Sequence, residues 1–335
     1  MKKSPSNFLE SLDSFLNSYL IKERGLSFNT QRSYKYTFKL LIEYFFTDLD
    51  KPADQILFSD LNYEVITNFL DWLEKQRGCS AITRNQRMAA LKSFSAYAQI
   101  YDADAATVFR TSMNKIQTKK YIPHKISFFS RDEVRFLLEV TEDSVIGHRN
   151  RAIFAFMYAT GARAQEVCDL KIADIHFTEN RSTVIISGKG NKMRRISISD
   201  KPSKIINDYL HETEKIFIPK AYVFSSRINE QMKISCIEEI YRKYIRMAKE
   251  VHPGYFPYSY SPHSMRHTTA THMLESGVSL MVIKNFLGHS SVETTQMYAE
   301  VTEKHFDAET AKWNEKWLQT KYVDKQNQNC PAFLR

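Results

Sequence analysis

The chain has 335 residues, of which 43% are apolar and 25% charged, a balance typical of a soluble globular protein with about two domains. It contains no apolar run long enough to span a bilayer, and no apolar stretch follows the two N-terminal lysines as in a signal peptide, so we expect a cytoplasmic protein. The net charge of +9 favours a polyanionic partner without distinguishing DNA from RNA or an anionic membrane.

Residues 1–103 are predicted to form an N-terminal domain made only of helices. Apolar residues recur at helical spacing in four segments, at about 8–25, 27–45, 65–78 and 83–101. Four helices with short connections predict a small all-α bundle.

Basic side chains on two of these helices, and in the segment after them, are candidates for contact with DNA phosphates. A solvated helix face explains such charges equally well. The candidates are Arg32, Lys35, Arg84, Arg87, Lys92, Lys119 and Lys120. The periodicity weakens over 104–127, a basic segment that contains Pro123, and we predict a linker there.

Residues 128–320 are predicted to form a second domain that begins with a helix. Ser130 and Glu133 have the spacing of a capping box in front of an apolar run. A second apolar helix includes 151–158, and Gly161 is its expected stop.

The hydrophobic period changes in the middle of this second domain. The β-rich runs 183–186 and 195–198 flank a Gly-Lys-Gly-Asn-Lys turn at 188–192, which predicts a β-hairpin. Helical patterns return afterwards, and 321–335 is expected to be a polar tail. The fold is therefore predicted to be mostly α with a small β-hairpin or sheet.

Arg163 precedes Glu166 by three residues, so both are expected on one face of the first turn of a new helix. An arginine in that position presents a planar fork of donors to a phosphate. An ordinary intrahelical ion pair explains the same two residues, and on this segment alone it is the better interpretation.

Ser261 and Pro262 are typical of the first positions of a helix. They place His263 and Arg266 on one face of its first turn. The free N–H groups and the dipole of a helix N-terminus favour an anion. A surface helix that begins with polar residues is the alternative.

Tyr298 follows His289 by nine residues, so on one continuous helix the two would lie on opposite faces. Gly288 predicts the end of one helix, and Ser290 with Glu293 predicts a capping box that begins the next. His289 is then expected in the connection between these two helices, where a bend of the chain can bring it and Tyr298 to one site.

This set of side chains is suited to transferring a phosphodiester. Guanidinium and imidazole donors stabilise the charge that develops on the non-bridging oxygens, without a metal. The phenol of Tyr298, with an ordinary pKa of about 10, becomes a nucleophile at neutral pH if positive neighbours lower that pKa. Lys189, at the predicted hairpin tip, is placed to protonate the leaving 5′-oxygen.

Five segments in this order resemble the tyrosine recombinase (phage integrase) family. Their sequences are most similar to those of Xer-type and mobile-element integrases. They are T-G-A-R-A-Q-E, G-K-G-N-K, S-P-H-S-M-R-H, L-G-H-S-S and T-T-Q-M-Y. The resemblance is strong over residues 128–300 and weaker over the N-terminal helices. Ala162 departs from the family pattern, in which a leucine is commoner next to the first arginine.

The resemblance implies a four-helix core-binding (SAM-like) domain followed by a catalytic domain. It implies a site-specific recombinase for integration, excision or resolution, acting through a 3′-phosphotyrosyl intermediate on double-stranded DNA as a homotetramer, with no metal or other cofactor. The implied catalytic residues are Arg163, Lys189, His263, Arg266, His289 and the nucleophile Tyr298, supported by Glu166. The DNA sequence, the accessory proteins and the direction of the reaction are not implied.

After Tyr298 the sequence predicts a helix with Trp313 and Trp317, which packs on its own domain or on a neighbouring subunit. The four cysteines form no C-x-x-C pair and suggest no zinc ribbon or disulfide framework.

Three other functions are compatible with parts of the pattern. A metal-dependent hydrolase would use His263 and His267, but no H-E-x-x-H motif is present. A DNA-binding protein without chemistry would not need Tyr298. A type IB topoisomerase would use similar groups and release the strand by swivelling.

Overall fold

The structure is a computed structural model that describes residues 7–121, 127–178, 182–188, 192–226 and 228–289. It divides into two compact units, Met1–His124 and Lys125–Arg335. No helix within the described ranges is long and apolar enough to cross a membrane.

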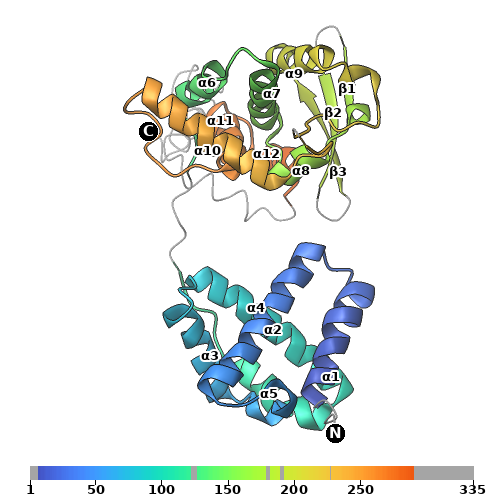
Figure 1. The fold of residues 1–335 in the computed structure, drawn as a ribbon, viewed down its shortest axis with the longest axis vertical. Helices are drawn as coiled ribbons and strands as arrows, with labels where there is room; N and C mark the ends of the chain where they lie inside the picture. Colours follow the sequence, from blue (N-terminus) through green and yellow to red (C-terminus); the bar gives the residue numbers. More distant parts are fainter. Residues whose placement is uncertain (1–6, 122–126, 179–181, 189–191, 227, 290–335) are drawn as a thin grey trace, which may run out of the picture. The chain divides into compact units, whose positions relative to one another are not determined.

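All regular elements in the described part of the N-terminal unit are helical, as the periodicity predicts (Figure 1). Ser27, Asn62 and Ser80 cap three of the helices by accepting a hydrogen bond from a backbone N–H of the first turn. The elements are α1 (Asn7–Ser14), a π-helical stretch (Phe15–Glu23), α2 (Phe28–Asp48), two 3₁₀ turns (Ala53–Gln55 and Phe58–Asp60), α3 (Tyr63–Lys75), α4 (Ala81–Tyr101) and α5 (Ala103–Lys115).

Helix α5 corrects the predicted linker, which was expected to begin at residue 104. Asp102 caps this helix, and its buried residues Ala106, Phe109 and Met113 join the core of the N-terminal unit. The spacing of these residues is helical, but three of the first four residues of the helix are alanines, so the apolar stripe is weak in the sequence. The N-terminal unit therefore has a fifth α-helix, and the linker starts later.

The C-terminal unit combines seven α-helices with one small sheet in its described part (Figure 1). The helices are α6 (Arg131–Glu139), α7 (Val145–Thr160), α8 (Ala164–Asp169), α9 (Asp200–Glu212), α10 (Ile234–Val251), α11 (Pro262–Glu275) and α12 (Leu280–Leu287). The strands are β1 (Ile175–Phe177), β2 (Ser182–Ser187) and β3 (Met193–Ile198), and 3₁₀ turns lie at Ile172–Asp174 and Lys215–Phe217. The capping box at Ser130 and Glu133 is confirmed.

Helix α7 is the centre of this unit, because apolar residues on most of its circumference are buried. Gly161 ends it in the left-handed conformation, with φ +59°. A Cβ on Gly161 would lie 2.5 Å from Leu287 Cδ2, so the end of α7 and the end of α12 are in close contact.

The predicted hairpin is confirmed as β2 and β3, paired antiparallel, and β1 adds a third strand that the sequence analysis did not predict. The tip residues 189–191 lie outside the described residues, but the N–H of Gly188 donates to Lys192 O at 2.8 Å and closes the strand ends. Along β3, Ile196 and Ile198 are buried while Arg195 and Ser197 are exposed.

Candidate active site

Arg163 lies at the junction between α7 and α8. It is the N-cap residue of α8, one position earlier than the predicted first turn. Its backbone N–H donates to Glu166 Oε2 at 2.9 Å, and its Nη1 donates to Glu166 Oε1 at 2.8 Å. The predicted pair is therefore present, and the Arg163 side chain is still 36% exposed. That leaves part of the guanidinium available to a ligand.

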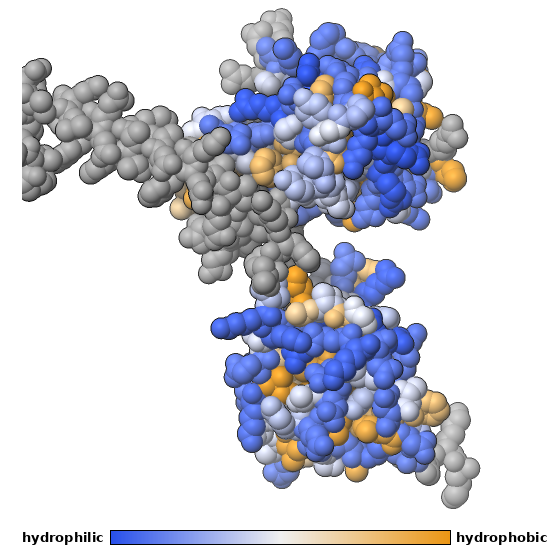
Figure 2. All heavy atoms as spheres, turned by 90° about the vertical axis from the view of Figure 1, so that its left-hand side faces the viewer, coloured by the Kyte–Doolittle hydropathy of each residue, from blue (hydrophilic) through white to orange (hydrophobic). Residues whose placement is uncertain are grey.

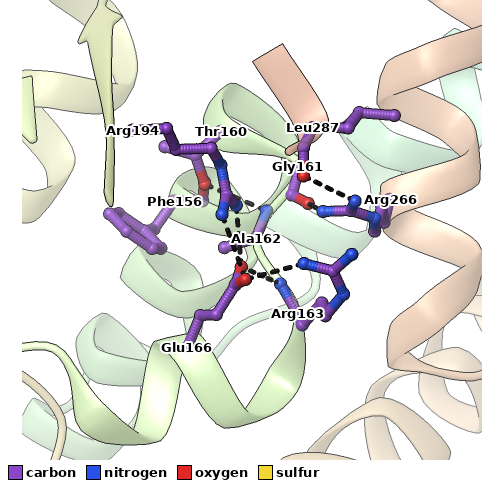
Figure 3. A network of polar contacts seen from close by, with 9 residues as sticks. All are labelled: Phe156, Thr160, Gly161, Ala162, Arg163, Glu166, Arg194, Arg266 and Leu287. Atoms are coloured by element: carbon purple, nitrogen blue, oxygen red, sulfur yellow. Dashed lines mark hydrogen bonds and ion pairs between the residues drawn. The ribbon is translucent and has the colours of Figure 1, made fainter. Parts of the chain in front are cut away.

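Glu166 is almost buried and also accepts two hydrogen bonds from Arg194 of β3, at 3.0 and 2.7 Å (Figure 3). Burial alone would raise the pKa of Glu166, but the hydrogen bonds and charges of Arg194, with those of Arg163, outweigh it and lower the pKa. The carboxylate is thus ionised between two guanidinium groups.

Arg194 is a site residue that the sequence analysis missed. Its side chain is only 10% exposed, and it lies on the same face of β3 as the buried Ile196 and Ile198. A charged residue at an inward position of an alternating strand was the available signal, because such a charge needs a partner.

Arg266 connects three segments of the site. It lies in the first turn of α11, whose predicted start at Ser261 and Pro262 is confirmed. The side chain is buried, and its guanidinium donates to Gly161 O and to Leu287 O, each at 2.7 Å (Figure 3). It therefore holds the end of α7 and the end of α12 against α11.

His289 directly follows Gly288, which ends α12 with φ +67°, as predicted. Burial first, then the charges of Arg266 and Arg163, lower the pKa of His289 to about 4. Burial and the same two arginines lower the pKa of His263. Because Arg266 and Arg163 both contribute to each of these shifts, the two histidines lie in one electrostatic site with both arginines, and both imidazoles are neutral at pH 7.

His267 adds a third imidazole next to these two. Its ring lies edge-to-face with that of His263, with 4.5 Å between ring centroids. Burial, together with His263 and Arg266, lowers the pKa of His267 to about 4. The sequence pattern indicated His267 only as a candidate metal ligand, whereas in the structure its ring packs against that of His263.

Several predicted residues lie outside the described residues. They are Lys189, the nucleophile Tyr298, the capping pair Ser290 and Glu293, and Trp313 with Trp317. The described part of the site thus comprises Arg163, Glu166, Arg194, His263, Arg266, His267 and His289.

The depressed pKa of His289 predicts a loss of stability in acid. Its value is about 4 in the folded protein and about 6.5 when unfolded, so between these pH values the unfolded chain binds a proton that the folded chain does not. The free energy of unfolding therefore falls as pH drops from 6.5 towards 4. His289→Asn should not show this part of the loss.

The measurement is the melting temperature of wild type and His289→Asn in the absence of DNA, from pH 7 to pH 4. The difference between them is the test, because His148 acts in the opposite direction: Glu212 and Asp143 raise its pKa. We expect wild type to lose more than the variant. A difference that is constant across this pH range would contradict a half-buried imidazole that stays neutral down to about pH 4.

A basic groove of about 520 Å³ lies on the N-terminal unit between α2 and α4. Arg87 is fixed at its wall, with Nη1 donating to Ser33 O at 3.0 Å and to Thr37 Oγ1 at 3.2 Å, and with its guanidinium over the ring of Tyr36. The lining comprises Asn29, Arg32, Ser33, Lys35, Tyr36, Lys39 and Arg87. Three of the predicted DNA contacts, Arg32, Lys35 and Arg87, are thus brought together.

The other predicted DNA contacts do not line this groove. Arg84 is buried, with Nε 3.5 Å from Glu74 Oε2, a position that does not favour a phosphate contact. Lys119 donates to the same carboxylate at 2.9 and 3.0 Å. Lys92 and Lys120 are exposed.

The surface seen in Figure 2 is largely hydrophilic in both units, with scattered apolar residues.

Two family models match this chain, one in each of its two units. The phage integrase family matches residues 127–305, and the phage integrase SAM-like domain matches residues 7–116. A putative integrase/recombinase, y4rC, from Sinorhizobium fredii is 30% identical over 302 residues, which cover 90% of each chain. Tyrosine recombinase XerD from Oceanobacillus iheyensis is 30% identical over 286 residues, 85% of this chain and 91% of that protein.

Two solved structures show the same fold. One is XerH site-specific recombinase bound to palindromic difH substrate, with a TM-score of 0.69 at 19% identity, covering 91% of this chain and 88% of that one. The other is the Tn1549 transposon integrase in complex with transposon right end DNA, with a TM-score of 0.70 at 17% identity, covering 89% of this chain and 98% of that one. The mostly helical fold with a small sheet is confirmed.

Proposed function

We propose a reaction for this chain on one premise: it belongs to the phage integrase family and is a tyrosine recombinase. Tyr298 Oη attacks a phosphorus atom of double-stranded DNA, and the bond from phosphorus to the 5′-oxygen breaks. The 3′ end of the strand is then joined to the tyrosine, and the 5′ end leaves as a hydroxyl. Attack by that hydroxyl, or by one from a second duplex, restores a phosphodiester.

The observation that supports this reaction is the meeting of Arg163, Arg266, His263 and His289 from three separate segments in one electrostatic site. Their charges and donors suit the trigonal-bipyramidal phosphorus, whose non-bridging oxygens gain negative charge. Arg163 is the more exposed of the two arginines and binds a non-bridging oxygen. Arg266 contributes its charge from a buried position and fixes the surrounding backbone.

Proton transfers are assigned to His263 and Lys189, and a hydrogen bond to the phosphate is assigned to His289. His263 is neutral at pH 7, so its imidazole can accept the phenolic proton of Tyr298. Lys189 protonates the leaving 5′-oxygen. His289, also neutral, donates an N–H to a non-bridging oxygen. Glu166 does not take part in these transfers and instead holds Arg163.

Duplex DNA is the proposed substrate, and the basic groove on α2 and α4 is the proposed phosphate-binding surface of the N-terminal unit. Four cations line it, and Arg32, Lys35 and Lys39 are exposed. Guanidinium and ammonium groups along a groove neutralise a phosphate backbone without reading its sequence.

This assignment predicts how affinity depends on salt. Each phosphate contact should contribute about 0.9 to the slope of log affinity against log salt concentration, so Arg32→Ala should reduce the slope by about 1. The matched control is Lys75→Ala on α3, which removes a cation that is 77% exposed and does not line the groove. Equal slopes for wild type and Arg32→Ala, measured by fluorescence anisotropy, would remove the groove from the DNA interface.

The recombination itself is tested on a DNA site obtained by selecting bound duplexes from a randomised pool. Two duplexes that carry the selected site should exchange strands through a four-way junction in the presence of excess EDTA, with four subunits on the paired sites. Relaxation of supercoiled DNA by monomers, without exchange, would instead indicate a topoisomerase. Loss of activity with EDTA would indicate a metal-dependent reaction.

A further inference from the structure

Arg194 lies where three parts of the site meet. Its guanidinium binds both oxygens of Glu166, and it lies close to the backbone at both Gly188 and Gly288: a Cβ on Gly188 would be 3.5 Å from Nη1, and one on Gly288 would be 3.3 Å from Cδ. Arg194 is thus enclosed between α8, the base of the hairpin and the end of α12. With a side chain that is only 10% exposed, it is not placed to bind a DNA phosphate itself.

The charges around Glu166 show what Arg194 does there. Two arginines share one carboxylate, so the three groups together carry a net charge of +1. Both Nη1 and Nη2 of Arg194 donate hydrogen bonds to the Glu166 carboxylate, whereas the Arg163 side chain donates one, through Nη1. Without Arg194, the Arg163 guanidinium would be the remaining partner of a buried negative charge, and its own charge would be neutralised.

We infer that Arg194 is a positioning residue for strand cleavage: it occupies Glu166 so that Arg163 keeps a positive charge for the scissile phosphate. This inference rests on the proposed function. Its physical basis is that a guanidinium already committed to a nearly buried carboxylate stabilises less of the charge that develops on the phosphate. Arg194 acts through Glu166 and Arg163 and needs no contact with DNA.

The test compares a neutral and a charged replacement at this position. Arg194→Gln removes the charge and keeps a long polar side chain, whereas Arg194→Lys keeps the charge and loses the fork. At saturating nicked DNA, we expect Arg194→Gln to slow single-turnover cleavage about 100-fold, the scale of effect that misplacing a catalytic group produces. Arg194→Lys should retain much more of the rate. DNA affinity should change little in either.

Removing the carboxylate charge provides the discriminating readout. If Arg194 is needed to neutralise Glu166, adding Glu166→Gln to Arg194→Gln should raise the cleavage rate about 10-fold above that of Arg194→Gln. This is the size of effect expected when one nearby charge is removed. A purely structural role predicts that the double variant is slower than either single one. The matched control is Arg195→Ala, the exposed neighbour on the other face of β3, which should cleave at the wild-type rate.

The outcomes separate this inference from the proposed function. If wild type cleaves but Arg194→Gln cleaves equally fast, or if Glu166→Gln brings no rescue, the inference is wrong and the proposed function stands. If Arg194→Gln fails to fold, Arg194→Lys takes its place in the comparison. Cleavage by Arg194→Lys about 100-fold slower than wild type would then overturn the inference, because the retained charge would not have preserved the rate. If wild type itself leaves the DNA uncut, the proposed function fails, and the inference fails with it.

Discussion

Tyr298→Phe is expected to abolish strand cleavage while leaving DNA binding unchanged. Phenylalanine keeps the ring but lacks the oxygen that bonds to phosphorus, and removing a nucleophile lowers the rate by about 10⁴-fold or more. Single-turnover cleavage of a nicked duplex measures the rate, and a gel shift on the same duplex measures binding.

Tyr258→Phe is the matched control for this substitution. Tyr258 is 53% exposed and lies in the loop before α11, so loss of its hydroxyl should leave the rate as in wild type. Cleavage by Tyr298→Phe within 10-fold of wild type, about 1.4 kcal/mol in activation free energy, would assign the nucleophile to another residue.

Arg266→Ala is expected to lose both cleavage and stability. The substitution removes a guanidinium from the charge around the phosphate, which should lower the cleavage rate by about 10²-fold or more. It also leaves the carbonyls of Gly161 and Leu287 without these donors in a buried place, at a cost of about 2–5 kcal/mol in the free energy of unfolding. Urea unfolding and single-turnover cleavage measure the two effects.

Two variants separate the contributions of Arg266. Arg266→Lys keeps the positive charge but cannot bridge two carbonyls with a planar fork, so it should recover part of the rate and little of the stability. Arg135→Ala removes an arginine on α6 that is 58% exposed, and both quantities should stay at wild-type values. DNA affinity should persist in Arg266→Ala because many other phosphate contacts remain. An Arg266→Ala protein with the stability of wild type would contradict the bridging role.

Local signals in the sequence were sufficient for most helices and for the hairpin. The capping pair Ser130 and Glu133, the stop at Gly161 and the helix start at Ser261 depend on neighbouring residues, and all three are confirmed. Each depends on a hydrogen bond or a backbone conformation within one helical turn, which the sequence encodes directly.

Contacts between distant segments were not predictable in the same way. Arg194 binds Glu166 across 28 residues, and Arg266 binds a carbonyl 105 residues earlier in the chain. Such partners are set by how α7, α11 and β3 pack, and no local pattern specifies them. The sequence therefore predicted Arg266 as a ligand for phosphate but not its hydrogen bonds to two backbone carbonyls.

Weakly patterned elements were also missed. Helix α5 has only two large buried apolar side chains, Phe109 and Met113, and β1 has three residues. Elements of this kind are stabilised by the core that they join more than by their own periodicity.

Identification of the residue joined to DNA is the most direct test of a tyrosine nucleophile at position 298. A nicked duplex with the selected site should trap the cleaved strand on the protein in the presence of EDTA. Proteolysis and mass spectrometry should then find a 3′-phosphate ester on Tyr298 Oη. An adduct on another residue, a linkage to the 5′ end, or cleavage without any adduct would contradict the proposed reaction.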